Sequence, residues 1–191
     1  MATTSIGSSG VTFPDSTTQS SAAKILQVVQ SVSNTLFSTT TSNTDITGLS
    51  VSITPKFSTS NILVIYNVIY GNSSAQPYSG INLICNGTAV PVGTSSGGYT
   101  GFTTPAVLAN PSNPENETRS YSFSYIHSPA TTSSVTYKLQ VGTIQSSRTV
   151  YINSNASNAG LLVSGVSQIL VMEVAPWTLI FTMLLELLIQ M

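Results

Sequence analysis

The stretch Asn61-Ile-Leu-Val-Ile-Tyr-Asn-Val-Ile-Tyr70 decides the fold. Nearly every position is apolar and many are β-branched or aromatic, which favours a β-strand over a helix. Apolar side chains occupy both alternating faces of this strand. The pattern therefore predicts a central strand that is covered on both sides.

Shorter segments on either side of this stretch also have strand patterns. Residues 49–54 alternate strictly between apolar and polar side chains, and Pro55 ends the run because proline cannot donate to a ladder. Residues 25–32 fit a helix turn or a strand, and their β-branched content favours the strand. We count about eight strands, with turn signals every eight to fifteen residues. The further predicted strands are 81–86, 119–126, 135–141, 150–152 and 168–174.

The composition limits the class of protein. The chain has 191 residues, of which 6% are charged and 41% are hydrophobic, and its formal net charge is −1. This hydrophobic content argues against disorder, and the lack of a basic stripe argues against nucleic-acid binding. Cys85 cannot form an intramolecular disulfide because it is the only cysteine. It alternates within a predicted strand, so we expect a buried filler.

The two ends of the chain differ from its middle. Residues 1–23 are rich in Ser, Thr and Gly and too poor in apolar side chains to form a core, so we interpret them as an extended arm, with a floppy tail as the alternative. Phe13 and Pro14 suit docking on another surface. No signal peptide is recognisable, so we expect synthesis in a cytoplasm without export. The predicted organisation is an arm over 1–23, an all-β antiparallel sandwich or jelly roll over 24–175, and a tail over 176–191.

The tail, residues 176–191, is apolar and rich in helix formers, and Pro176 suits a helix start. A helix here would be about 22 Å long, short of the roughly 30 Å of a bilayer core. Both sides of it would be apolar, so it must be buried against something. Copies of the same chain, a neighbouring protein and a membrane are the three alternatives, in that order of preference. The residues on a coiled-coil-like seam are Trp177, Ile180, Leu184, Leu187 and Met191.

Candidate contact residues lie in or near loops. Residues 93–114 contain Gly-Gly and three prolines, which indicates a long connection of the kind that is often functional. Aromatic and amide side chains on the loops of a rigid β-scaffold suit contact with a ligand, although they also fit packing against the scaffold. The residues that we predict to contact a receptor are Tyr78, Tyr99, Phe102 and Asn110.

Catalytic constellations are not recognisable in the sequence. Glu115 and Glu117 lie in one Asn/Pro-rich loop, which does not place two carboxylates across a sugar bond. His127 is the only histidine, so a multi-ligand metal site is not expected and we interpret it as structural. Glu173 lies within an apolar strand, where it either points to solvent or pairs with one of the few cations, and we favour solvent. The sequence predicts no enzyme, no cofactor and no metal.

One motif carries a resemblance. Gly10-Val-Thr-Phe-Pro-Asp-Ser-Thr-Thr-Gln19, followed by Ala22-Ala23, resembles a motif of tailed-bacteriophage tail fibre and receptor-binding proteins that precedes a C-terminal β-domain. Ser16 stands where the family usually has glycine. Segments 45–55, 61–65, 149–153 and 167–174 resemble strands of that domain, and the segment from Pro176 onward departs from the pattern.

The resemblance implies a homotrimer with an N-terminal arm fixed to the virion, a host-facing β-domain and no catalytic residues. The arm residues assigned to virion attachment are Val11, Phe13 and Pro14. The predicted function is therefore a structural virion protein, made in a bacterial cytoplasm, that serves in a tail or baseplate fibre. Its expected partners are copies of itself, other virion proteins, and a host-surface glycan or protein. The alternative is a head-decorating cement or fibre-adaptor protein with a purely structural role.

Overall fold

The computed structural model describes residues 5–7, 10–12, 18–19, 25–73, 79–91, 93–94, 101–106, 117–143, 149–155 and 164–175. Within these residues the chain is all-β, with antiparallel sheets and no helix, as the sequence predicts. It contains no helix there that could cross a membrane. The predicted helix over 176–191 and its seam residues lie outside the described part, as do Phe13 and Pro14 of the arm.

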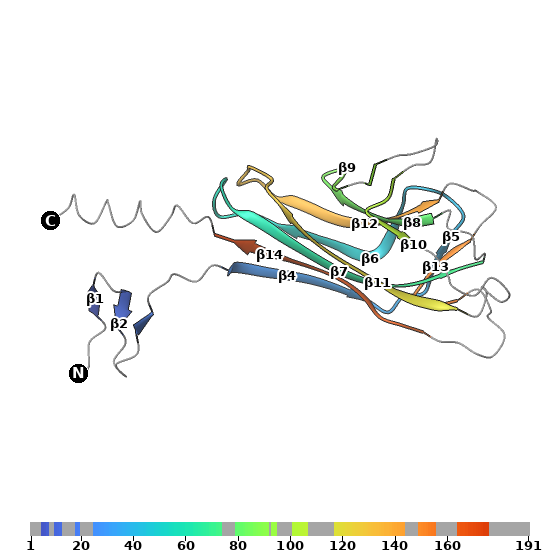
Figure 1. Cartoon of the computed structure of the whole chain (residues 1–191), viewed down its shortest axis with the longest axis horizontal. Helices are drawn as coiled ribbons and strands as arrows, with labels where there is room; N and C mark the ends of the chain where they lie inside the picture. The colour runs from blue at the N-terminus through green and yellow to red at the C-terminus, as the bar shows by residue number, and fades with distance from the viewer. Residues whose placement is uncertain are drawn as a thin grey trace.

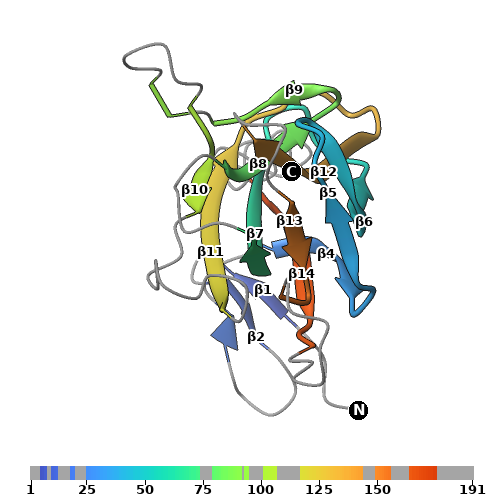
Figure 2. The same cartoon turned by 90° about the vertical axis from the view of Figure 1, so that its right-hand side faces the viewer.

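Two sheets pack face to face (Figures 1 and 2). Sheet I has six strands, in which β14 and β13 flank one side of β7 and β11 the other. Sheet II has five strands in the order β10-β8-β12-β6, with β9 on β8. Sheet I consists of β4 (Ile25–Ser33), β14 (Ser167–Val174), β7 (Asn61–Asn72), β13 (Val150–Ile152), β5 (Phe37–Thr39) and β11 (Thr118–His127). Sheet II consists of β10 (Thr104–Ala106), β8 (Ser79–Cys85), β12 (Val135–Thr143), β6 (Thr44–Ile53) and β9 (Thr88–Ala89).

The arm region contains a sheet of its own, which is a correction to the plain extended segment that composition suggests. Strands β1 (Ser5–Gly7), β2 (Gly10–Thr12) and β3 (Thr18–Gln19) pair antiparallel in that order. Val11, one of the predicted attachment residues, lies on the middle strand and pairs with Ile6 and Gln19. The motif around residue 10 thus has regular backbone pairing on its first three residues.

Strand β7 is central, as predicted, but only one of its faces is fully covered. Its inward side chains are completely buried and pack against sheet II, whereas its outward side chains are half-exposed. Within the described residues the prediction of cover on both sides is not met, because sheet II covers only the inner face of sheet I. The fully buried residues of β7 are Ile62, Val64, Tyr66, Val68 and Tyr70.

The strands define two ends of the sandwich. At the end that we call the base, β4 begins and β14 ends, with Ile25 paired to Val174. At the opposite end, the tip, β7 ends at Asn72 beside Val150 of β13, and β8 begins at Ser79 beside Thr143. Four of the longer connections, 73–78, 107–117, 144–149 and 153–166, join strand ends at the tip (Figure 1).

Glu173 corrects a second prediction. Its side chain is 0% exposed and points inward at the base rather than to solvent. The Gln27 side chain donates to Oε2 at 2.6 Å and the Lys56 backbone N–H donates to Oε1 at 2.7 Å. Burial alone would raise the pKa of Glu173, but the hydrogen bonds that its carboxylate accepts outweigh burial and lower it. The carboxylate thereby ties β14 to β4 and to the 54–60 connection.

Two single residues behave as the sequence predicts. Cys85 is buried, and burial raises the pKa of its thiol, so it is a core filler rather than a reactive group. His127 packs edge-on against the Tyr137 ring, with its Nδ1 hydrogen-bonded to the Tyr137 hydroxyl at 2.8 Å. Burial lowers the pKa of His127 from its ordinary value of 6.5. This contact holds the end of β11 on β12.

Candidate ligand-binding site

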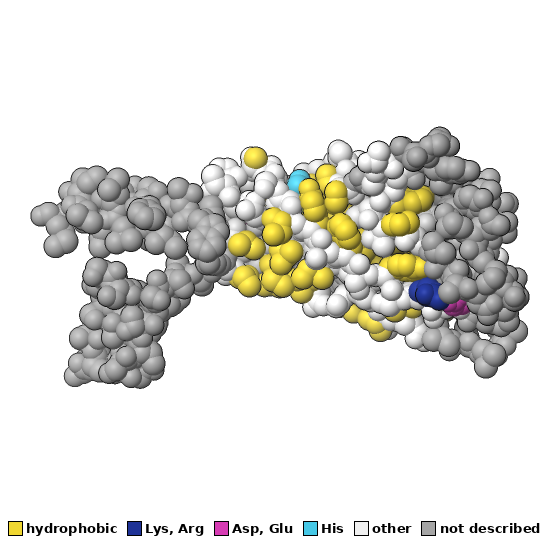
Figure 3. Space-filling model, viewed as in Figure 1, with side chains coloured by type: hydrophobic (Ala, Val, Ile, Leu, Met, Phe, Trp, Pro, Cys, Tyr) yellow, Lys and Arg dark blue, Asp and Glu magenta, His cyan; other side chains and the backbone are white. Residues whose placement is uncertain are grey.

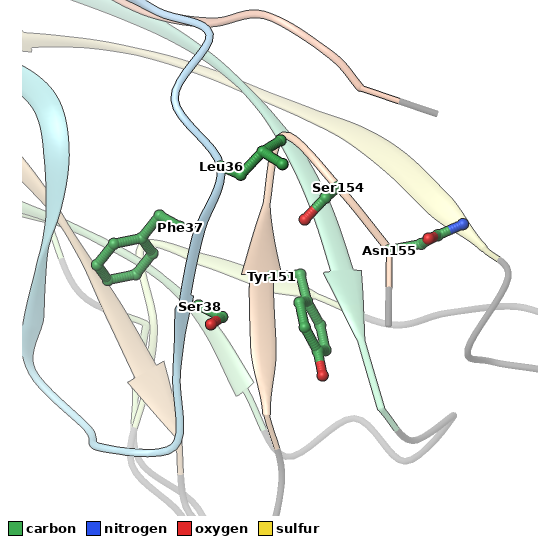
Figure 4. A pocket seen from close by; sticks show the side chains of 6 residues that line it. All are labelled: Leu36, Phe37, Ser38, Tyr151, Ser154 and Asn155. Carbon is green, nitrogen blue, oxygen red and sulfur yellow. The ribbon is translucent and has the colours of Figure 1, made fainter. Parts of the chain in front are cut away.

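A small pocket opens at the tip, between β5 and β13. Their register places Tyr151 directly opposite Ser38, so these two side chains share one face. The pocket holds about 110 Å³. That volume is below the roughly 300–1,000 Å³ typical of pockets for drug-sized ligands, so it fits one group or one edge of a larger molecule. The lining residues are Leu36, Phe37, Ser38, Tyr151, Ser154 and Asn155 (Figure 4).

The pocket wall combines an aromatic ring with apolar and hydroxyl groups. Leu36 is 52% exposed at the rim of the pocket. Phe37 packs partly into the core, and the Tyr151 ring is half-buried. Ser154 is buried. None of the described residues that line the pocket is charged. The chemistry is that of a neutral, hydroxyl-rich ligand that presents one apolar face.

Asn153 fixes the backbone that enters the pocket. It adopts a left-handed φ of 62°, which asparagine tolerates better than most residues. Its Nδ2 donates to the carbonyls of Ser33 at 2.9 Å and Thr35 at 3.0 Å, while its Oδ1 accepts from the Ser167 hydroxyl at 2.6 Å. All these contacts are internal to sheet I and its connections. Asn153 is therefore a fully satisfied structural residue that sets the course of residues 154 and 155.

Asn155 differs from Asn153 although it lies only two residues further on. The residue is 3% exposed and lines the pocket, yet its Oδ1 has no hydrogen-bond partner in the described part of the protein. A buried carbonyl without a partner costs about 1–3 kcal/mol. Such a group calls for an explanation, which an ordered water or a donor on a bound molecule would supply.

Close backbone packing supports the pocket floor. A Cβ on Gly71 of β7 would lie 2.5 Å from the Ser154 carbonyl oxygen and 3.1 Å from the Asn155 Cα. Any larger residue at this position would push the 154–155 backbone away from β7. Glycine therefore lets the floor of the pocket rest directly on the central strand.

The structure describes one of the four predicted receptor-contact residues, Phe102. Tyr78, Tyr99 and Asn110 lie outside the described residues, so their prediction stays open. Phe102 is 9% exposed, and its ring lies so close to Gly80 and Gly142 that a Cβ there would come within 2.6 and 2.3 Å of it. This corrects the prediction for Phe102, because the ring packs on sheet II instead of facing a ligand.

Sequence reasoning missed the pocket. It predicts an ordinary short strand over 150–152 and assigns no role to 36–38. The available signals were the apolar pair Leu36-Phe37 within a Ser/Thr-rich segment and two asparagines directly after a strand. Neither signal indicates that β5 pairs with β13.

Catalytic and metal-binding groups do not converge in the described residues. Glu117 forms an ion pair with Arg119, with 2.6 Å between Oε1 and Nε, and Glu115 lies outside the described part. The described ranges contain no group of three or more His, Cys, Asp and Glu side chains that could hold a metal ion.

Comparison with known proteins identifies no family. No protein-family model matches the chain, and no curated protein sequence does either. Among solved structures, it is similar to a structure of infectious bursal disease virus Gx strain, with a TM-score of 0.36 and 14% identity over 84% of this chain. It is also similar to the VP2 subviral particle of infectious bursal disease virus, with a TM-score of 0.35 and 14% identity over 78% of this chain.

The chain spans 39% and 37% of the chains in those two structures. At such TM-scores and identities the likeness carries no argument about what this chain does.

Proposed function

We propose that this chain is a structural component of a virus particle that binds carbohydrate on a host surface through the pocket at its tip. The observation that carries the proposal is a pocket lined both by the half-buried Tyr151 ring and by Asn155, whose buried Oδ1 has no partner among the described residues. Sugars offer hydroxyl donors for such an acceptor and apolar C–H faces for an aromatic ring. The volume of about 110 Å³ suits one edge of a longer glycan.

The placement of the pocket supports this proposal. The described sandwich begins at Ile25 and ends at Ala175 at the base, while the pocket lies at the tip (Figure 1). A domain attached through its base would present the tip outward. The motif at residues 10–19 resembles that of tail fibre proteins, which favours a tail or baseplate fibre in which the arm attaches to the particle.

Weak binding at a small pocket gains strength from repetition. We propose that the chain acts as a homotrimer and that several trimers sit on one particle, so that binding is multivalent. Linked sites raise overall affinity by about 10²–10⁴ without any new contact. The pocket of a single copy can therefore be weak and still support attachment.

The test is binding of the full-length protein to intact bacteria and to immobilised surface polysaccharides from the same strains. Tyr151→Ala should lower retained protein at least tenfold, because it removes the aromatic wall. Tyr125→Ala is the matched control: it truncates another half-buried tyrosine, whose strand neighbour at the base is Val64. Equal binding by both variants and the unmodified protein would refute the tip site.

A second function, that of a head-decorating cement or adaptor protein, is favoured by one observation. Near the base, the outer face of sheet I exposes apolar side chains, which suits permanent packing against other subunits. Labelling the protein on intact particles separates the two functions. Label on the head together with unchanged host binding by Tyr151→Ala would favour the purely structural role.

A further inference from the structure

The outer face of sheet I has an apolar band near the base. The registers of β4, β14, β7 and β11 place Val28, Met172, Leu63 and Ile126 next to one another in a single row across four strands. Val28 is 53% exposed and Ile126 is 60% exposed. Figure 3 shows hydrophobic side chains gathered near the base, over β4, β14 and β7.

The apolar character of this face fades toward the tip. The row next to Met172 contains Gln30, Leu170, Ile65 and Ser124, and only its two middle residues are apolar. In the following row, Val32 is the one apolar residue, beside polar side chains from the other three strands. On the base side, Ile25 pairs with Val174. The apolar band is therefore strongest beside the point where β14 leaves the sheet.

The chain itself supplies an apolar segment at that point. Residues 176–191 follow Val174 after a single intervening residue, Ala175, and Glu186 is their only charged residue. The fifteen residues after Pro176 would form a helix of about 22 Å. That length matches about seven residues of strand at roughly 3.3 Å each, the distance from Val174 back to Gln168. The segment has both the length and the composition to cover the band.

We propose that residues 176–191 fold back over the apolar band of sheet I of their own chain. Tethering favours this occupant, because a short link gives the segment an effective concentration in the millimolar range. Burial of the band and of the apolar segment supplies the driving force, about 25 cal/mol for each Å² of apolar area removed from water. The proposal does not depend on the ligand site at the tip. It is an alternative to the clasp between copies that the sequence alone suggests.

The single tryptophan of the chain, Trp177, reports on this packing in the full-length protein. Ile126→Asp and Val28→Asp each place a charge in the band at a side chain that is more than half exposed, so the core is undisturbed. Ser122→Asp is the matched control, since it adds the same charge to the polar part of the same face. Emission spectra are recorded over a hundredfold dilution series, with light scattering for mass and circular dichroism for folding.

We expect short-wavelength Trp177 emission in the unmodified protein that does not change on dilution. Ile126→Asp and Val28→Asp should shift it toward the value of the urea-unfolded chain, whereas Ser122→Asp should not. Water-exposed emission in the unmodified protein would overturn the proposal, as would equal emission in all three variants. A shift on dilution that accompanies a fall in mass would overturn it in favour of the clasp between copies. If one band variant fails to fold, the other gives the result.

Discussion

The base and the tip of the sandwich both bury polar side chains, but the two ends differ in how fully these side chains are hydrogen-bonded. At the base, the Glu173 carboxylate accepts hydrogen bonds at both of its oxygens. At the tip, Asn153 is equally well satisfied, while Asn155 leaves its carbonyl oxygen without a partner in the described residues. A satisfied buried group holds the fold together, whereas an unsatisfied one lowers stability unless something binds it.

This difference separates structural residues from candidate functional ones without reference to sequence motifs. Asn153 and Asn155 are the sharpest instance, because they have the same side chain, are both nearly inaccessible and lie two residues apart. Their expected responses to mutation are opposite. The predictions that follow begin with the largest expected effect.

Asn153→Ala should be the most damaging change. It removes the donors to the Ser33 and Thr35 carbonyls and the acceptor for Ser167, and it places alanine at a left-handed φ. The free energy of unfolding should fall by about 3 kcal/mol, since several buried groups lose their partners together. Urea denaturation of the full-length protein measures it. A loss below about 1 kcal/mol would show that the Asn153 contacts are not cooperative.

Glu173→Gln tests the base. Glutamine offers one acceptor oxygen where the carboxylate offers two, so either Gln27 or the Lys56 N–H would face an amide donor. We expect the free energy of unfolding at pH 7 to fall by about 2 kcal/mol, as for hydrogen bonds to a charged group.

The same variant should also change the pH dependence of stability. Because the pKa of Glu173 in the folded protein lies below its ordinary value of 4.5, its stabilisation is complete above that pH and is lost as the pH falls through the lower folded value. The stability gap between Glu173→Gln and the unmodified protein should therefore close below pH 4.5. A gap that stays constant with pH would contradict the role of the charge.

Asn155→Leu should have the opposite sign to Asn153→Ala. Replacing a buried amide whose carbonyl oxygen lacks a hydrogen-bond donor by an apolar side chain of similar size should leave stability unchanged or raise it by about 1 kcal/mol. Thermal unfolding monitored by circular dichroism detects the change. Marked destabilisation would mean that Asn155 is structural and that the contrast with Asn153 does not hold.

Arg119→Met should have the smallest effect. The ion pair with Glu117 is partly exposed, with 42% of the Arg119 side chain accessible. Exposed pairs contribute about 0–1 kcal/mol, so urea denaturation should show a change of less than about 0.5 kcal/mol. A larger loss would mean that the start of β11, next to the tip, depends on charge more than the buried networks suggest.

Much of the fold could be predicted from local patterns. The β-rich composition, the central place of β7 and the burial of Cys85 follow from alternation and apolar content. Whether the outer side of β7 is covered could not be predicted, because an apolar outward face fits a second covering layer as well as an exposed band. Glu173 was misjudged because neither its register toward sheet II nor its donors, Gln27 and Lys56, can be read from its own strand.

The candidate site could not be predicted from the sequence for a related reason. Leu36 and Asn155 are more than a hundred residues apart and meet only because β5 pairs with β13. Whether an asparagine carbonyl lacks a partner depends on all of its neighbours in space. Loop aromatics such as Phe102 attract attention in a sequence, yet the ring of Phe102 packs against Gly80 and Gly142.

The most direct test of the tip site is a thermal unfolding experiment on the unmodified protein and Asn155→Leu, each with and without surface polysaccharide from a host strain that the protein binds. A ligand that binds only the folded state stabilises it by RT ln(1 + [L]/Kd) and so raises the melting temperature. We expect the polysaccharide to raise the melting temperature of the unmodified protein and to leave that of Asn155→Leu unchanged. An equal rise in both proteins would contradict the assignment of the unpartnered Asn155 carbonyl to ligand binding.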